Sequence, residues 1–93
     1  MKFEWDSAKS AINIRKHGIA FQDVIEIFGH PMLTQLDMRH DYGEDRWIGI
    51  GLMKSIMAVV IYIEWEDENT IRIISARKAT RYESKEFHKR ISF

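Results

Sequence analysis

Four cations surround a predicted change from strand to helix near the carboxyl end of the chain. They are Arg72, Arg77, Lys78 and Arg81. The first turn of a helix exposes unpaired amides and the positive end of the helix dipole, which favours anions and disfavours cations. Cations placed there indicate an anionic partner such as a phosphate, which amides and guanidinium groups can bind together. The alternative interpretation is a set of ordinary solvated charges.

The neighbouring residues predict the elements that position these cations. The isoleucine-rich segment 71–74 is typical of a strand buried on both faces, which we expect to end near Ser75. Thr80 and Glu83 have the spacing of a capping box, so a helix is predicted to begin at Thr80. The apolar stripe of this helix is imperfect and consists of Tyr82, Phe87 and Ile91.

Length and charge limit the classes of protein to consider. The 93 residues suffice for one domain, residues 1–93, with a modest core. The net charge is zero, but residues 71–93 hold seven Lys/Arg against two Asp/Glu, and residues 1–70 hold seven against twelve. The basic segment can bind a polyanion, and the acidic remainder can attract a basic protein.

The absence of cysteine excludes a disulfide framework and a thiolate metal site, and it favours a reducing, cytoplasmic location. The start of the chain lacks the apolar region of a signal peptide, and no apolar run approaches the length of a membrane span. We therefore expect a cytoplasmic protein without membrane contact.

The amino-terminal part predicts a short strand followed by a helical hairpin. Residues 2–5 alternate polar and aromatic side chains, and Asp6 is a favourable N-cap for a helix that ends at Gly18. Lys16 and His17 lie in its last turn, where cations complement the helix dipole. Apolar residues in 21–28 recur at the spacing of a second, short helix.

The middle of the chain predicts the remaining strands. These are 33–38, 46–52 and 57–63, separated by a polar loop at 39–45 and by short turns. Strands joined by short connections favour an antiparallel meander, so the expected fold is α+β with the helical hairpin on the sheet and a carboxyl-terminal helix. Trp47, Gly49 and Gly51 share one strand face, which indicates close packing of another backbone, a bulge or, less commonly, room for a nucleotide.

With these elements placed, nearly the whole chain resembles the BrnT family of toxins from bacterial type II toxin-antitoxin systems. The segments that carry the resemblance are FEWD at 3–6, NIRKHGI at 13–19, EDRW at 44–47 and, above all, RIISARKATR at 72–81 followed by Glu83. The sequence departs from the family pattern at Ser7, where Pro is common, and in the long acidic turn 65–69. Neither departure involves the basic residues.

The resemblance implies a RelE-like fold and a ribonuclease that arrests translation. It also implies neutralisation by a BrnA-type antitoxin with a ribbon-helix-helix part, a heterotetramer with that antitoxin, and contact with DNA only through it. These expectations come from the family and not from composition or periodicity.

Metal-independent RNA cleavage requires proton transfer and stabilisation of a phosphorane. We assign Arg77 and Arg46 to charge stabilisation, because guanidinium stays charged and matches two phosphate oxygens. His17 is the first candidate for proton transfer and Lys16 the second, with Tyr82 or Glu83 third. A histidine at the end of a helix is, however, more often a capping residue.

A further set of residues is expected to bind the RNA chain. It comprises Trp47, Arg72, Lys78, Arg81, Tyr82 and Lys85. The aromatic rings can stack on bases, although core packing is their commoner role.

No metal or other cofactor is expected. The four histidines are scattered without a His-x-x-x-His pair, and no Gly-rich phosphate loop or nucleophilic triad is present. Two alternatives to the enzyme remain from the sequence: a catalytically inactive module that binds nucleic acid or antitoxin in an autorepressor complex, and a purely structural partner in that complex.

Overall fold

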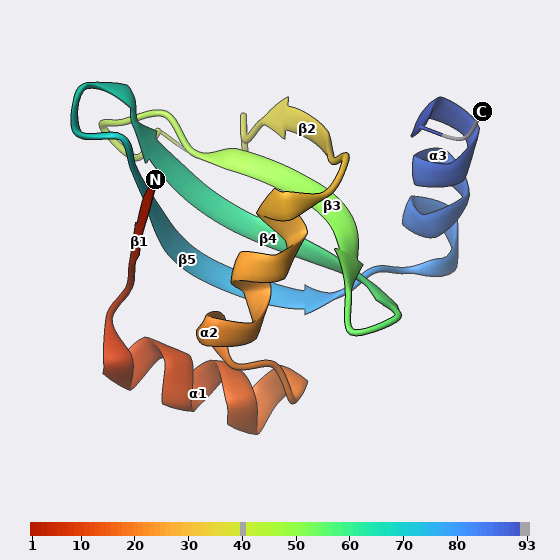
Figure 1. The fold of residues 1–93 in the computed structure, drawn as a ribbon, viewed down its shortest axis with the longest axis horizontal. Coiled ribbons are helices and arrows are strands. Elements are labelled where there is room, and N and C mark those ends of the chain that lie inside the picture. Colours follow the sequence, from red (N-terminus) through yellow and green to blue (C-terminus); the bar gives the residue numbers. More distant parts are fainter. Residues whose placement is uncertain (40, 92–93) are drawn as a thin grey trace.

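One mixed five-stranded sheet forms the centre of the structure (Figure 1), a computed structural model that describes residues 1–39 and 41–91. The strand order is β1-β5-β4-β3-β2. The elements in chain order are β1 (Lys2–Glu4), α1 (Ser7–His17), α2 (Phe21–Val24), the 3-10 helix η1 (Ile25–Gly29), β2 (Leu33–Leu36), β3 (Trp47–Met53), β4 (Ile56–Trp65), the 3-10 helix η2 (Glu66–Glu68), β5 (Thr70–Lys78) and α3 (Arg81–Ile91).

The antiparallel meander is confirmed for β2 to β5, but the prediction of a wholly antiparallel sheet is wrong at β1. This strand pairs in parallel with β5, from Lys2 opposite Thr70 to Glu4 opposite Arg72. A parallel partner needs a crossover connection instead of a tight turn. All the chain from α1 to β4 lies between these two strands, which is why the short connections of the middle strands did not reveal their pairing.

The last strand is longer than predicted, because β5 continues past Ser75 to Lys78. Its final residues pair with β4, with Ala76 opposite Val60 and Lys78 opposite Ala58. The register shifts between Ile61 and Tyr62 of β4. The extension carries Arg77 within the sheet, where its side-chain direction is set by the strand.

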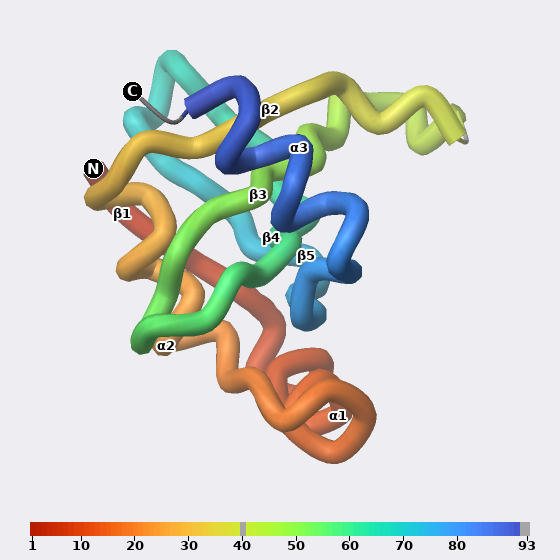
Figure 2. The backbone as a smooth tube through the Cα atoms, turned by 90° about the vertical axis from the view of Figure 1, so that its right-hand side faces the viewer, coloured from red at the N-terminus to blue at the C-terminus, as the bar shows by residue number. Residues whose placement is uncertain are grey.

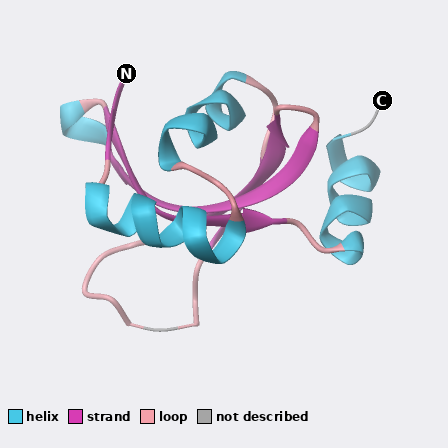
Figure 3. Cartoon of the chain, turned by 90° about the horizontal axis from the view of Figure 1, so that it is seen from below, coloured by secondary structure: helices cyan, strands magenta, loops and turns pink. Residues whose placement is uncertain are grey.

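Helices cover both faces of the sheet. The larger core lies under α2 and η1 and joins Phe21, Val24 and Ile27 to Val60 and Ile73. A smaller cluster on the other face joins Phe87 of α3 to Ile50 and Val59. Figure 3 shows α1 and α2 together and α3 separate from them, beyond the end of the sheet. None of the helices in residues 1–39 and 41–91 is long and apolar enough to cross a membrane.

The glycine strip of β3 is filled by core side chains. A Cβ at Gly49 would lie 2.4 Å from Met32 Cε, and one at Gly51 would lie 2.8 Å from Ile27 Cγ2. Trp47 packs against the larger core on the same face. The predicted close approach of another backbone is therefore wrong, because side chains fill the strip, and they leave no room for a nucleotide.

Both predicted ends of α1 are confirmed. The Asp6 carboxylate accepts hydrogen bonds from the amides of Ala8 and Lys9, and Gly18 closes the helix with a φ of 71°. Asn13 is the buried residue of this helix. Its side chain donates to the Ile19 carbonyl at 2.8 Å and accepts from the Ala76 amide at 3.2 Å.

Asn13 completes the sheet edge that β1 leaves open. β1 pairs with β5 only from Thr70 to Arg72, so the amide of Ala76 lies beyond the end of β1. The Asn13 side chain takes the place of a strand at that point and attaches α1 to β5. This contact determines where His17 lies, four residues further along the same helix.

We expect Asn13→Ala to lower the free energy of unfolding by about 2–6 kcal/mol, because two buried backbone groups lose their partner and each costs roughly 1–3 kcal/mol. Ile14→Ala is the matched control, since Ile14 is exposed on the same helix and should change stability by less than about 0.5 kcal/mol. Urea unfolding followed by circular dichroism measures both. Equal losses in the two variants would contradict the role of Asn13.

Candidate functional site

A cavity of about 660 Å³ lies on the sheet face that carries α3. This volume is within the range of roughly 300–1,000 Å³ that is typical of ligand sites. Its polar and charged lining comes from α1, β2, the β2–β3 connection, β5 and α3, and includes His17, Gln35, Arg39, Ser75, Arg77, Thr80, Tyr82, Glu83, Glu86 and Arg90. The floor is apolar and consists mainly of Ile48, Ile50, Val59 and Ile61.

Four of the residues named for the chemistry from the sequence line this cavity: His17, Arg77, Tyr82 and Glu83. They come from the end of α1, the end of β5 and the start of α3. The structure thus brings together a proton-transfer candidate, a phosphate-binding candidate and an aromatic ring from elements far apart in the sequence.

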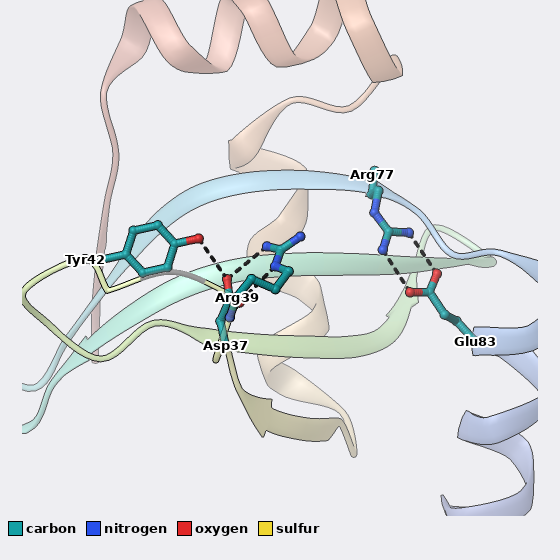
Figure 4. A network of polar contacts seen from close by, with 5 residues as sticks. All are labelled: Asp37, Arg39, Tyr42, Arg77 and Glu83. Atoms are coloured by element: carbon teal, nitrogen blue, oxygen red, sulfur yellow. Dashed lines mark hydrogen bonds and ion pairs between the residues drawn. The ribbon is translucent and has the colours of Figure 1, made fainter.

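Arg77 is held by Glu83 in a bidentate ion pair (Figure 4). Its Nη1 and Nη2 atoms each donate to one Glu83 oxygen at 2.8 Å, and Nη1 also donates to the Lys78 carbonyl. The hydrogen bonds from Arg77 lower the pKa of Glu83 to about 2. The same pair raises the pKa of Arg77. Both groups therefore remain charged at neutral pH.

Glu83 also forms the predicted capping box at the start of α3. Its carboxylate accepts from the Thr80 amide at 2.8 Å, and the Thr80 hydroxyl accepts from the Glu83 amide at 3.1 Å. The Glu83 carboxylate thus caps the start of α3 and also orients the Arg77 guanidinium on the neighbouring strand β5. The wall of the cavity between β5 and α3 is consequently fixed by this side chain.

The ion pair leaves one edge of the Arg77 guanidinium available. Glu83 takes the edge formed by Nη1 and Nη2, and no residue within 1–39 and 41–91 accepts a hydrogen bond from Nε. The Nε–H and the outer Nη2–H form a second fork of the kind that binds two phosphate oxygens. Arg77 can therefore bind Glu83 and a phosphate at the same time.

His17 is exposed at the last position of α1 and lines the cavity from beside β5. Lys16 is also exposed, but it is not part of the lining. The two neighbours therefore differ in their access to a bound substrate. Tyr82 lines the cavity and is 72% exposed.

The structure does not bring Arg46 into the cavity. Its guanidinium lies over the ring of Tyr42 at 4.0 Å, and its Nε is buried without a hydrogen-bond partner among the described residues. A different arginine of the same connection, Arg39, lines the cavity instead. The sequence analysis missed Arg39, although the Asp37-x-Arg39 spacing after a strand allows a local ion pair that would have indicated an oriented guanidinium.

The other predicted RNA-binding residues lie outside the lining. Arg72 forms an ion pair with Glu4 between β5 and β1, and the strand register places Lys78 opposite Ala58 of the larger core. Arg81 and Lys85 are exposed on α3, and Trp47 packs against that core. Their roles in binding RNA stay predictions.

Among the described residues, which include three of the four histidines, no group of three or more His, Asp or Glu side chains is arranged to hold a metal ion. The remaining histidine, His40, lies outside the described residues. The charged groups of the cavity are instead arranged as pairs of one arginine and one carboxylate.

The depressed pKa of Glu83 predicts how stability depends on pH. A carboxylate with a folded pKa of about 2 against an ordinary 4.5 stabilises the fold above about pH 4.5 and loses that contribution as the pH falls toward 2. We therefore expect Glu83→Gln to be most destabilising near neutral pH and progressively less so in acid, as measured by urea unfolding over a pH series.

Glu86→Gln is the control, because Glu86 pairs with the exposed Arg90 at 3.4 Å on the same helix. Exposed ion pairs of this kind contribute little to the free energy of unfolding, roughly 0–1 kcal/mol. A loss of stability in Glu83→Gln that is the same at all pH values would show that the ion pair is not its cause.

Comparison with known proteins identifies a family for the chain. A family model described as the ribonuclease toxin BrnT of type II toxin-antitoxin systems matches residues 5–83, a span that includes His17, Arg39, Arg77 and Glu83. No curated protein matches the chain. The matched span covers most of the chain, and the protein therefore belongs to the BrnT family of ribonuclease toxins.

Proposed function

We propose that the chain is a metal-independent endoribonuclease toxin that cleaves RNA in the cavity between β5 and α3 and thereby inhibits translation. Two observations support the proposal: membership of the BrnT family, and the presence of His17 and Arg77 in one cavity. The second observation carries the chemistry, because it joins a group that transfers protons to one that binds phosphate.

In the proposed reaction a ribose 2′-hydroxyl attacks the adjacent phosphorus, and its proton passes to the neutral His17 imidazole. The free edge of Arg77 stabilises the charge that develops on the non-bridging oxygens. The bond from phosphorus to the 5′-oxygen breaks, and the imidazolium returns the proton to that oxygen. The products are a 2′,3′-cyclic phosphate and a 5′-hydroxyl.

Residues outside the cavity are proposed to bind the flanking parts of the strand. Lys78, Arg81 and Lys85 are exposed around the start of α3 and can contact neighbouring phosphates. Tyr82 can stack on a base at the rim, a contact that contributes roughly 1–3 kcal/mol in single strands. Arg72 is paired with Glu4 and Trp47 packs against the core, so we expect smaller contributions from both.

Control of the toxin is proposed to follow the family pattern. A BrnA-type antitoxin with a ribbon-helix-helix part would neutralise the chain, form a heterotetramer with it in the cytoplasm and provide the contact with DNA. A RelE-like layout of the sheet belongs to the same proposal. Its support is the family membership, which concerns a type II toxin-antitoxin system.

We expect Arg77→Gln to reduce cleavage of single-stranded RNA in EDTA by about 10²–10³-fold, the loss that follows removal of one donor to a transition-state oxyanion. Lys54→Gln is the control, since Lys54 pairs with Asp23 at 3.1 Å and is not part of the cavity lining. Gel analysis with detection of cyclic-phosphate ends measures both variants. RNA binding without cleavage by the wild type would favour the alternative of an inactive binding module.

We expect His17→Gln to reduce the cleavage rate by roughly 10²–10⁴-fold without weakening the binding of RNA, because proton transfer matters only in the reaction step. His88→Gln is the control, since His88 is exposed on α3 and is not part of the lining. Single-turnover kinetics give the rate, and fluorescence anisotropy with a 2′-O-methyl oligonucleotide gives the affinity. An unchanged cleavage rate would contradict proton transfer by His17 and would favour its alternative role as a capping residue at the end of α1.

A further inference from the structure

Arg39 is a guanidinium anchored on a buried carboxylate. Asp37, whose side chain is fully buried, accepts from Arg39 Nε and Nη2 at 2.9 Å each and from the Arg39 amide at 3.1 Å. Tyr42 donates its hydroxyl to the same carboxylate at 3.3 Å. The hydrogen bonds from Arg39 hold the pKa of Asp37 well below its usual range. Asp37 is therefore charged and orients the Arg39 side chain, although 63% of that side chain is exposed.

The edge of Arg39 that Asp37 does not use is available to a ligand. Asp37 takes the edge formed by Nε and Nη2, and Tyr42 also interacts with the guanidinium and helps to raise the pKa of Arg39. Among the hydrogen bonds within residues 1–39 and 41–91, none with Nη1 as the donor atom is seen. In Figure 4 the third nitrogen of this guanidinium has no dashed contact and lies on the side away from Asp37. The Nη1 and outer Nη2 hydrogens form a fork that matches two phosphate oxygens.

Arg39 and Arg77 line the same cavity from two different parts of the fold. Arg39 lies in the β2–β3 connection, which Figure 2 shows extending from the sheet, and Arg77 lies near the end of β5. Glu83 raises the pKa of Arg77, whereas the charge of Arg39 lowers it, so the two cations repel each other across the cavity. An anion bound between them would relieve this repulsion.

We propose that Arg39 is a second phosphate-binding residue of the cavity, which contacts the RNA backbone opposite Arg77. This inference rests on the proposed function and adds a residue that neither the sequence motifs nor the family match assigns. Each guanidinium uses one edge for its own carboxylate and presents the other to the phosphodiester. The two together fix the direction in which the strand crosses the cavity.

A purely structural role of Arg39 would be to neutralise Asp37. Replacement of Arg39 alone cannot distinguish this role from phosphate binding, because it leaves a buried carboxylate without its main partner. The double variant Asp37→Asn/Arg39→Gln removes both charges together. It leaves the net charge unchanged and retains two amide groups that can hydrogen-bond to each other.

The test measures binding of a 2′-O-methyl oligonucleotide over a salt series for the wild type, Arg39→Gln, the double variant and Lys54→Gln. Lys54 is the matched cation, since it is also 63% exposed and also paired with an aspartate. We expect Arg39→Gln and the double variant to bind at least about ten-fold more weakly. Their slopes of log K against log salt should be shallower by up to about 0.7, the value for one contact with a single-stranded phosphate.

Each outcome decides the inference. If the single and double variants lose the same amount of affinity for the oligonucleotide and Lys54→Gln binds like the wild type, the result supports phosphate binding by Arg39. Recovery of the wild-type affinity and salt slope in the double variant would show that Arg39 only neutralises Asp37 and does not bind phosphate. If the wild type cleaves RNA and depends on Arg77 but neither Arg39 variant changes binding, this inference fails while the proposed function stands. If the wild type does not bind RNA, both fail.

Discussion

The carboxylate of Glu83 is the group on which the geometry of the cavity depends. It accepts from both Nη atoms of Arg77 and from the Thr80 amide, so it joins the end of β5 to the start of α3. A helix cap alone would fix α3, and an ion pair alone would fix Arg77. Because one carboxylate does both, the position of the guanidinium relative to the helix has little freedom.

This double role also resolves the conflict in the sequence between Arg77 and the helix start. Cations near a helix N-terminus are unfavourable on dipole grounds alone. Arg77 tolerates the position because the carboxylate that caps the helix lies between it and the exposed amides. Its ion pair is not evidence against phosphate binding, since the edge formed by Nε and Nη2 is not used by Glu83.

Local signals in the sequence were sufficient for the parts of the fold that local contacts determine. The capping box of α3 and both ends of α1 follow from side chains and backbone groups only a few residues apart, so spacing revealed them. The parallel pairing of β1 with β5 joins residues 68 positions apart, and no short pattern encodes it. The face to which Trp47 and the glycines of β3 point was predicted, but what covers that face depends on η1 and the segment that follows it.

The residues of the candidate site also divide into those that local context predicted and those that it did not. His17 and Arg77 were found because each lies in a marked local context, a helix end and a strand end. Arg46 and Arg39 belong to one polar connection without periodicity, where spacing gives no direction for a side chain. The structure places Arg46 over Tyr42 and Arg39 in the cavity, and the difference arises from the buried Asp37, whose burial the sequence did not indicate.

The charges of the site form two groups with different physical effects. The arginines that line the cavity, Arg39, Arg77 and Arg90, are each paired with a carboxylate, which weakens their long-range fields but does not remove the repulsion between Arg39 and Arg77. Within the described residues, Lys78, Arg81 and Lys85 have no such partner within 4 Å and lie outside the lining. The outer cations can attract a polyanion over distances up to the Debye length, about 10 Å at moderate salt. Under the proposed function, the inner pairs would act at contact, where the direction of their free edges would orient a phosphate. Attraction and orientation of the strand would then come from separate residues.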